Sequence, residues 1–307
     1  MRVALRSFLG SIVLLAACVV VADKPTELSH VHAPTVASSG TPDLEGLADL
    51  IVDAKTTQNH WVTRVEDLPA SLCSVEEGNI TPGTHKVIRF TVTTPNIGDA
   101  DVFVGNPIDH MDPNGDGNFA DQDGMFEFAS CHNHFHFRNY ATYRLIGEDG
   151  TVWKAAKRGF CMLDTDPYNV KNTDGNGDGT WTYRSCGTTT FPGFQGISAG
   201  WADTYVFQLA GQYFVLDGGD GQPEVPPGVY TIEIHVNPPS APDAAGNCPL
   251  VKDPATGQCH NFAEASYANN IGRATVIITD HPGRAGVGPL KNDKTKITRE
   301  SEVAKGQ

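Results

Sequence analysis

Three histidines alternate with other residues directly after a cysteine, in the sequence FEFASCHNHFHF at residues 126–137. Imidazole nitrogens bind copper and zinc better than calcium or magnesium, so the spacing of His132, His134 and His136 predicts a transition-metal site. Three histidines that are held only by water and carbonyl groups are the alternative. Three imidazoles within five residues favour the metal, because so many are difficult to bury without a partner.

The segment that carries the histidines must bend before all three imidazoles can reach one ion. Side chains alternate across a strand, so the three histidines share one face while Phe135 and Phe137 anchor the other face in the core. On a flat strand the Cα atoms of His132 and His136 lie ~13 Å apart, and a histidine reaches only ~6–7 Å from Cα to a metal. We expect a bend or bulge, or two histidine ligands completed by a loop residue.

A second pattern precedes this segment and has the spacing of a calcium loop. DPNGDGNFADQD (residues 112–123) fits Asp-x-Asn-x-Asp-Gly with an acidic residue at the twelfth position. The residues predicted to offer oxygen ligands to calcium are Asp112, Asn114, Asp116 and Asp123. The twelfth residue is aspartate where glutamate is usual, and a strand follows where a helix is usual. A solvent-exposed turn without an ion is therefore the alternative.

The elements that position these residues are predominantly strands. Segments rich in β-branched and aromatic residues, separated by turns rich in glycine and proline, predict strands at residues 85–94, 126–137, 140–146, 151–156, 180–186, 205–216, 229–236 and 274–279. Only residues 45–57 have a helical pattern, and there is no βαβ alternation or repeat. We expect an all-β fold, an irregular β-sandwich-like single domain with long loops and little helix, over residues 46–280.

Composition and charge limit the kinds of partner. The 307 residues are 39% hydrophobic and include 32 glycines and 20 prolines, which suits a globular β-rich protein with many turns. The formal net charge of −14 argues against a nucleic-acid partner and favours a cationic one.

The two ends of the chain are expected to lie outside the fold. Residues 1–22 have a basic start, an apolar run and small residues at the end, which predict an export signal that is removed. Leu-Ala-Ala-Cys at residues 15–18 offers a second interpretation, a lipoprotein site with a lipid anchor on Cys18. We therefore expect a secreted protein or a cell-envelope lipoprotein. Residues 23–45 are predicted to be a flexible linker and residues 281–307 a disordered tail.

An even number of cysteines remains after the signal. Six cysteines in an exported chain favour disulfide bonds. Cys248 and Cys259 flank a loop of proline, aspartate and glycine and are expected to close it. The residues alone leave open how the other four pair: Cys73, Cys131, Cys161 and Cys186.

Several segments together resemble the lysyl oxidase family. FEFASCHNHFHF resembles the copper motif of that family, in which a cysteine precedes His-x-His-x-His. AAKRGFCMLDTD (155–166) is similar to the segment with the cofactor lysine, and QGISAGWADTY (195–205) to the segment that ends in the cofactor tyrosine. VPPGVYTIEIHVNP (225–238) and EASYANN (264–270) resemble the closing strands. The resemblance runs from about residue 47 to 280 with the motifs in the same order.

The resemblance implies a function. It implies copper at His132, His134 and His136, and a lysine tyrosylquinone made from Tyr205 and Lys157. Enzymes of this kind oxidise primary amines, including peptidyl lysine, to aldehydes with O2 and release hydrogen peroxide and ammonia. Without the resemblance, neither the tyrosine nor the lysine would be singled out.

The resemblance also implies a catalytic base and a disulfide. Asp203 shares the face of Tyr205 on a strand, and Asp217 lies near the position of a family aspartate; either is a candidate base, and either could be an ordinary turn or edge carboxylate. Cys131 would pair with Cys186, which leaves Cys73 and Cys161 as a hypothetical third pair.

The chain departs from the family pattern at three positions. Ala129 replaces a histidine of the family, and Asn79 and Pro167 stand where it has cysteines. Two other functions stay open: a non-catalytic metal-binding or adhesion β-sandwich, and a zinc hydrolase that uses the same three histidines.

Overall fold

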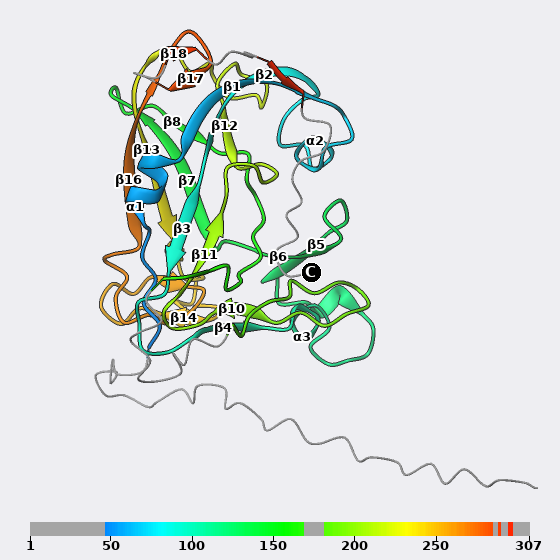
Figure 1. The fold of residues 1–307 in the computed structure, drawn as a ribbon. Helices are drawn as coiled ribbons and strands as arrows, with labels where there is room; N and C mark the ends of the chain where they lie inside the picture. The colour runs from blue at the N-terminus through cyan, green and yellow to red at the C-terminus, as the bar shows by residue number, and fades with distance from the viewer. Residues whose placement is uncertain (1–46, 169–180, 285–287, 290–293, 297–307) are drawn as a thin grey trace, which may run out of the picture. The chain divides into compact units, whose positions relative to one another are not determined.

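A computed structural model describes residues 47–168, 181–284, 288–289 and 294–296, mostly as short strands (Figure 1). These residues include three α-helices of six residues or fewer and form no closed barrel. The predicted all-β class is therefore confirmed. The predicted signal, Cys18 and the linker lie outside the described residues. Within the described part of the chain, no helix has the length and apolar character needed to span a membrane.

Two mainly antiparallel sheets pack against each other across the main core. The first sheet runs in the order β16 (Ile271–Ile278), β13 (Gly228–Val236), β7 (Ala141–Gly147) and β8 (Val152–Lys154). The second runs in the order β12 (Tyr213–Val215), β2 (Gly83–Phe90), β1 (Trp61–Leu68), β17 (Gly283–Arg284) and β18 (Gly288–Pro289), with β19 (Lys294–Lys296) parallel to β1.

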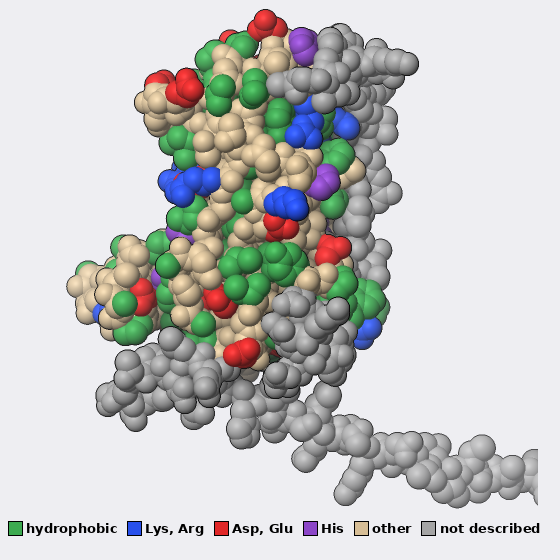
Figure 2. Space-filling model, turned by 60° about the vertical axis from the view of Figure 1, so that its left-hand side comes forward, with side chains coloured by type: hydrophobic (Ala, Val, Ile, Leu, Met, Phe, Trp, Pro, Cys, Tyr) green, Lys and Arg blue, Asp and Glu red, His purple; other side chains and the backbone are tan. Residues whose placement is uncertain are grey.

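The alternation of residue types accounts for the packing of these sheets. Ile232 and Ile234 of β13 are fully buried, while Glu233 between them faces the other side of the sheet. Phe90 of β2 stacks on Phe214 at 4.9 Å and meets the edge of Tyr143 of β7 at 5.4 Å between ring centroids. On the face of the molecule shown in Figure 2, acidic, basic and hydrophobic side chains are interspersed.

The strands β17, β18 and β19 lie within the segment that was predicted to be a disordered tail. Gly283 of β17 pairs with Thr63 of β1, and Lys294–Lys296 run alongside residues 65–67 of the same strand. The prediction is therefore wrong for these short strands. Strand β1 offers β17 and β19 a backbone edge that composition does not reveal, and β18 pairs with β17.

Smaller sheets extend the sandwich toward the histidine segment. They consist of β3 (Val92–Pro95), β11 (Trp201–Tyr205) and β9 (Asp166–Pro167); β4 (Val102–Gly105) with β10 (Gln195–Ile197); β14 (Val251–Lys252) with β15 (Cys259–His260); and β5 (Phe126–Ala129) with β6 (His134–Phe137). The helices are α1 (Ala54–Asn59), α2 (Cys73–Glu76) and α3 (Pro107–Met111), with a 3-10 turn at Phe119–Asp121.

The helix predicted at residues 45–57 forms only at its end. Asp53 caps α1 by accepting hydrogen bonds from the backbone N–H groups of Lys55 and Thr56. The preceding residues are extended, because Ala48 bridges to Glu264 and the backbone around it pairs with distant segments. Tertiary pairing outweighs the local helical pattern here.

Residues 126–137 form a hairpin and not the single strand that was predicted. Strand β5 ends at Ala129, residues 130–133 turn, and β6 begins at His134. Asn133 has a φ of 55°, a left-handed conformation that asparagine tolerates better than most residues. The turn is the bend that the histidine spacing required.

The disulfides near this hairpin differ from the implied pattern. Cys131 bonds Cys73, and Cys186 bonds Cys161, so the expected pairs Cys131–Cys186 and Cys73–Cys161 are wrong. The hairpin turn brings Cys131 to α2, which begins at Cys73. Cys161 and Cys186 lie with Leu163 in a separate buried cluster.

The third disulfide has the partners that the sequence predicted. Cys248 bonds Cys259 and closes the loop that contains β14 and β15. The expected closure of this loop is therefore confirmed.

Candidate active site

The hairpin β5–β6 brings three imidazoles together. His134 and His136 lie on one face of β6, and His132 comes from the turn that precedes it. Phe135 and Phe137, which alternate with them, are 2% and 1% exposed and anchor the strand in the core. One face of this short strand therefore carries the candidate metal-binding side chains, and the other carries the side chains that pack in the core.

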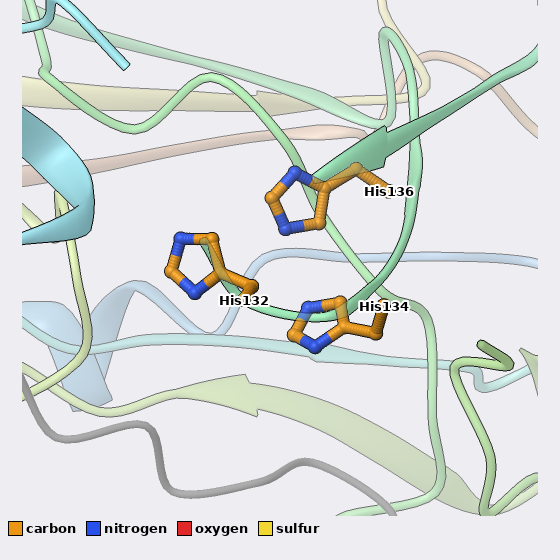
Figure 3. A group of neighbouring side chains, drawn as sticks. All are labelled: His132, His134 and His136. Atoms are coloured by element: carbon orange, nitrogen blue, oxygen red, sulfur yellow. The ribbon is translucent and has the colours of Figure 1, made fainter. Parts of the chain in front are cut away.

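The three imidazoles point toward one another, as Figure 3 shows. One nitrogen of each histidine lies within 4.8 Å of the corresponding nitrogens of the other two. The ring centroids are 5.0 to 5.4 Å apart. A set of three nitrogen donors in this arrangement fits copper or zinc, so the residues present suit the ion that the sequence implied.

The innermost histidine is held in the neutral form that binds metals. Burial lowers the pKa of His136 well below its usual value, and the positive charge of Lys157 and the neighbouring imidazoles lower it further. A neutral imidazole keeps a lone pair for an ion. Lys157 therefore lies close enough to the histidine cluster to influence it electrostatically.

Lys157 also approaches the tyrosine that the resemblance singled out. Its Nζ lies 5.3 Å from the centroid of the Tyr205 ring and 5.5 Å from that of Phe160. Tyr205 ends strand β11, pairs with Val92 of β3 and is 2% exposed. Two residues that are distant in sequence are thus neighbours, the tyrosine buried and the lysine half-buried.

The hydroxyl group of Tyr205 is fixed by the backbone. It donates to the carbonyl oxygen of Cys161 at 2.8 Å and accepts from the N–H of the same residue at 2.8 Å. Burial raises the pKa of Tyr205 well above 10, and the charge of Asp203 and two nearby tyrosines raises it further. The phenol is therefore protonated at neutral pH.

The two candidate bases lie in different surroundings. Asp203 is fully buried in β11, and its charge raises the pKa of Tyr205, Tyr140 and Tyr143. Asp217 is exposed; it accepts from the backbone N–H of Lys86 at 2.8 Å and lies 3.1 Å from Nδ1 of His85. Of the two, only Asp203 lies on the same strand as Tyr205 and acts on it electrostatically.

A cavity of about 620 Å³ opens beside His136. Its wall is formed by the end of α2, the β5–β6 hairpin and residues 158–159. Three carboxylates and one guanidinium line it: Glu76, Glu77, Glu127 and Arg158. A cavity with this excess of acidic groups favours cations.

The predicted calcium loop lies before β5, and hydrogen bonds join its side chains to its own backbone. The carboxylate oxygens that lie within 4.8 Å of one another belong to Asp112, Asp116 and Asp121. Asp123, which was predicted to complete the set, instead lies 2.6 Å from Nδ1 of His110. Asn114 accepts the backbone N–H of Asp116 at 2.9 Å. Asp121 thus takes the place predicted for Asp123 in this cluster.

Comparison with known proteins decides the family. A family model described as lysyl oxidase matches residues 68–243, more than half of the chain. The chain belongs to the lysyl oxidase family. Lysyl oxidases are copper-dependent amine oxidases that generally use a quinone cofactor. No curated protein matches the chain.

The lysyl oxidase match includes the histidine cluster, the lysine and the tyrosine. No sequence pattern indicated the acidic residue that lies beside the cluster. Glu77 lies 3.1 Å from Nε2 of His132, and Asn79 and Arg158 lie beside it. Asn79 was noted only because it stands where the family has a cysteine. No local pattern could reveal these contacts, because they join segments that are far apart in the chain.

Proposed function

We propose that this lysyl oxidase is a secreted copper amine oxidase that converts primary amines to aldehydes. The observation that carries the proposal is the position of Lys157, whose Nζ is 5.3 Å from the ring of Tyr205 and whose charge acts on His136. The lysine therefore connects the histidine cluster to the tyrosine. A site that only stored a metal would not need a lysine and a buried phenol beside it.

His132, His134 and His136 would hold copper. Copper with O2 supplies the oxidation that turns a nearby phenol into a quinone, and the quinone supplies an electrophilic carbonyl for an amine. Tyr205 offers the phenol, and Lys157 offers the amine nearest to its ring for the lysine tyrosylquinone. The backbone of Cys161 holds the hydroxyl group of the phenol in place through one accepted and one donated hydrogen bond.

Asp203 is the better placed of the two candidate bases. It lies on the same strand as Tyr205, is fully buried and acts electrostatically on the phenol. A carboxylate in this position can take the proton from the carbon next to the substrate nitrogen. Asp217 is exposed and interacts with His85 and Lys86, which is the role of a turn carboxylate.

The cavity beside His136 supports a cationic substrate. Primary amines, including lysine side chains of peptides, carry a positive charge at neutral pH. Glu76 and Glu127 lie in the wall of the cavity and would attract them. The products would be an aldehyde, ammonia and hydrogen peroxide, with O2 as the oxidant.

Export is part of the proposal. The three disulfides of the described residues are typical of proteins outside the reducing cytoplasm. The apolar segment at residues 1–22 would provide the signal, and Cys18 the alternative lipid anchor.

The test compares two tyrosine variants after aerobic loading with copper. Tyr205→Phe should abolish peroxide release upon addition of a primary amine, because it lacks the phenol from which the quinone forms. Tyr230→Phe is the matched control; its hydroxyl bonds only the carbonyl oxygen of Pro226 among the contacts described, and it should keep the activity. Full turnover in Tyr205→Phe would overturn the proposal.

A further inference from the structure

One acidic residue of the cavity touches a histidine of the cluster. Oε1 of Glu77 lies 3.1 Å from Nε2 of His132, which is hydrogen-bonding distance. The side chain of His132 is 7% exposed and that of Glu77 is 29% exposed, so the contact is partly shielded from water.

The carboxylate of Glu77 is held in place from its other side. Its Oε2 accepts from Nδ2 of Asn79 at 3.2 Å, and Oδ1 of Asn79 accepts from Nε of Arg158 at 3.2 Å. Asn79 is 6% exposed. Arg158, Asn79 and Glu77 therefore form a chain of hydrogen bonds that ends on His132.

The backbone at Glu77 is fixed as well. Its N–H donates to the carbonyl oxygen of Cys73 at 2.9 Å, which closes the single turn of α2. Cys73 is bonded to Cys131, the residue that precedes His132. The disulfide thus joins the segment that carries Glu77 to the segment that carries His132.

The other glutamate near the cluster is placed differently. Oε1 of Glu127 is 4.0 Å from Nδ1 of His136, beyond hydrogen-bonding distance. Its Oε2 accepts from Nε of Arg138 at 3.1 Å. Glu127 is therefore directed toward the arginine, and Glu77 is directed toward the histidine.

We propose that Glu77 is a positioning residue of the copper centre. It accepts the Nε2–H of His132, which fixes the orientation of the ring and leaves the lone pair of Nδ1 for the ion. Histidines that bind metals commonly donate their second N–H to a carboxylate in this way, and the carboxylate increases the basicity of the ligand. The inference rests on the proposed copper site.

The test measures copper affinity in the full chain by competition with a chelator and records the Cu(II) electron paramagnetic resonance spectrum. Glu77→Ala should weaken copper binding about 10- to 100-fold, the range for loss of such a partner, and should change the spectrum. Glu77→Gln should recover part of the affinity, because its amide oxygen can still accept the N–H. Circular dichroism and a count of disulfides by mass confirm that each variant is folded.

Glu76→Ala is the matched control. It removes the carboxylate of the residue next to Glu77, at the end of α2 and in the wall of the same cavity, and no described contact joins it to a histidine. Its copper affinity and spectrum should stay close to those of the wild type. If Glu77→Ala and Glu76→Ala had the same affinity and spectrum, the inference would be wrong while the copper site stood. A wild-type protein that bound no copper would refute the proposed function as well.

Discussion

The phenol of Tyr205 has little freedom at the scale of the single residue. The backbone of Cys161 both donates to and accepts from its hydroxyl group, and burial keeps its pKa well above 10. The ring is therefore a neutral phenol whose hydroxyl group is held in place. Lys157 lies over that ring, so the proposed crosslink would need no large movement of the backbone.

Another residue far from the histidines makes folding depend on pH. The carboxylate of Glu264 accepts from the backbone of Leu50 and from the side chains of Asn237 and Asn270. Burial, the largest effect, raises the pKa of Glu264 from 4.5 to about 7. The folded protein thus binds a proton more tightly than the unfolded chain.

We predict that Glu264 stabilises the fold most in its protonated form. Its contribution is present below pH 4.5 and is lost as the pH rises through about 7. The raised pKa corresponds to about 3 kcal/mol of unfolding free energy. Denaturant unfolding of the wild type and Glu264→Gln from pH 4 to 8 should show the stability of the wild type, relative to the variant, falling by about this amount. A constant difference would contradict the prediction.

At the scale of the elements, α2 is too short to hold its own position. It has four residues, and its first residue is bonded to the tip of the hairpin β5–β6. The disulfide Cys73–Cys131 spans 58 residues and joins two segments that carry the cavity wall. The proposed copper site and the cavity therefore share one covalent support.

We predict that the double variant Cys73→Ala/Cys131→Ala is less stable by about 4 kcal/mol, from the loop entropy of the unfolded chain. It should also bind copper more weakly, because α2 and Glu77 are no longer held at His132. Cys248→Ala/Cys259→Ala, which opens a loop of only 11 residues, is the control and should keep the copper affinity. Urea unfolding measures the stability, and chelator competition measures the copper affinity. Equal copper affinity in the two double variants would show that the disulfide Cys73–Cys131 does not support the copper site.

At the scale of the whole molecule, the charge of the protein should influence which amines it takes up. The net charge is −14, and the cavity beside the histidines has three glutamates and one arginine in its wall. This negative charge attracts cations. Salt weakens the attraction, because the screening length is about 10 Å at 0.1 M ionic strength.

We predict that added salt raises KM more for a diamine than for a monoamine of the same chain length. The diamine carries a second positive charge in the field of the cavity, so screening removes more of its attraction. The rise should be severalfold between low and high salt, with kcat nearly unchanged, in assays of peroxide release. Equal salt dependence for the two amines would show that the acidic wall has no role in uptake.

The sequence predicted what is encoded locally. The spacing of His132, His134 and His136 indicated the need for a bend, and the β-branched and aromatic residues predicted the strands β2, β7, β13 and β16. It failed where distant segments decide the outcome. Residues 47–53 are extended because they pair with Asn96 and Glu264, and four cysteines pair differently because a turn carries Cys131 to α2. Glu77 was not found, since only the folded chain brings it to His132.

Peptide mapping by mass spectrometry after aerobic loading with copper tests the proposed crosslink most directly. We expect one crosslinked product that contains Tyr205 and Lys157, with the mass of the two peptides plus one oxygen atom and minus four hydrogen atoms. The product should be missing from protein kept without copper. Recovery of both peptides unmodified from protein that binds copper and oxidises amines would contradict the account.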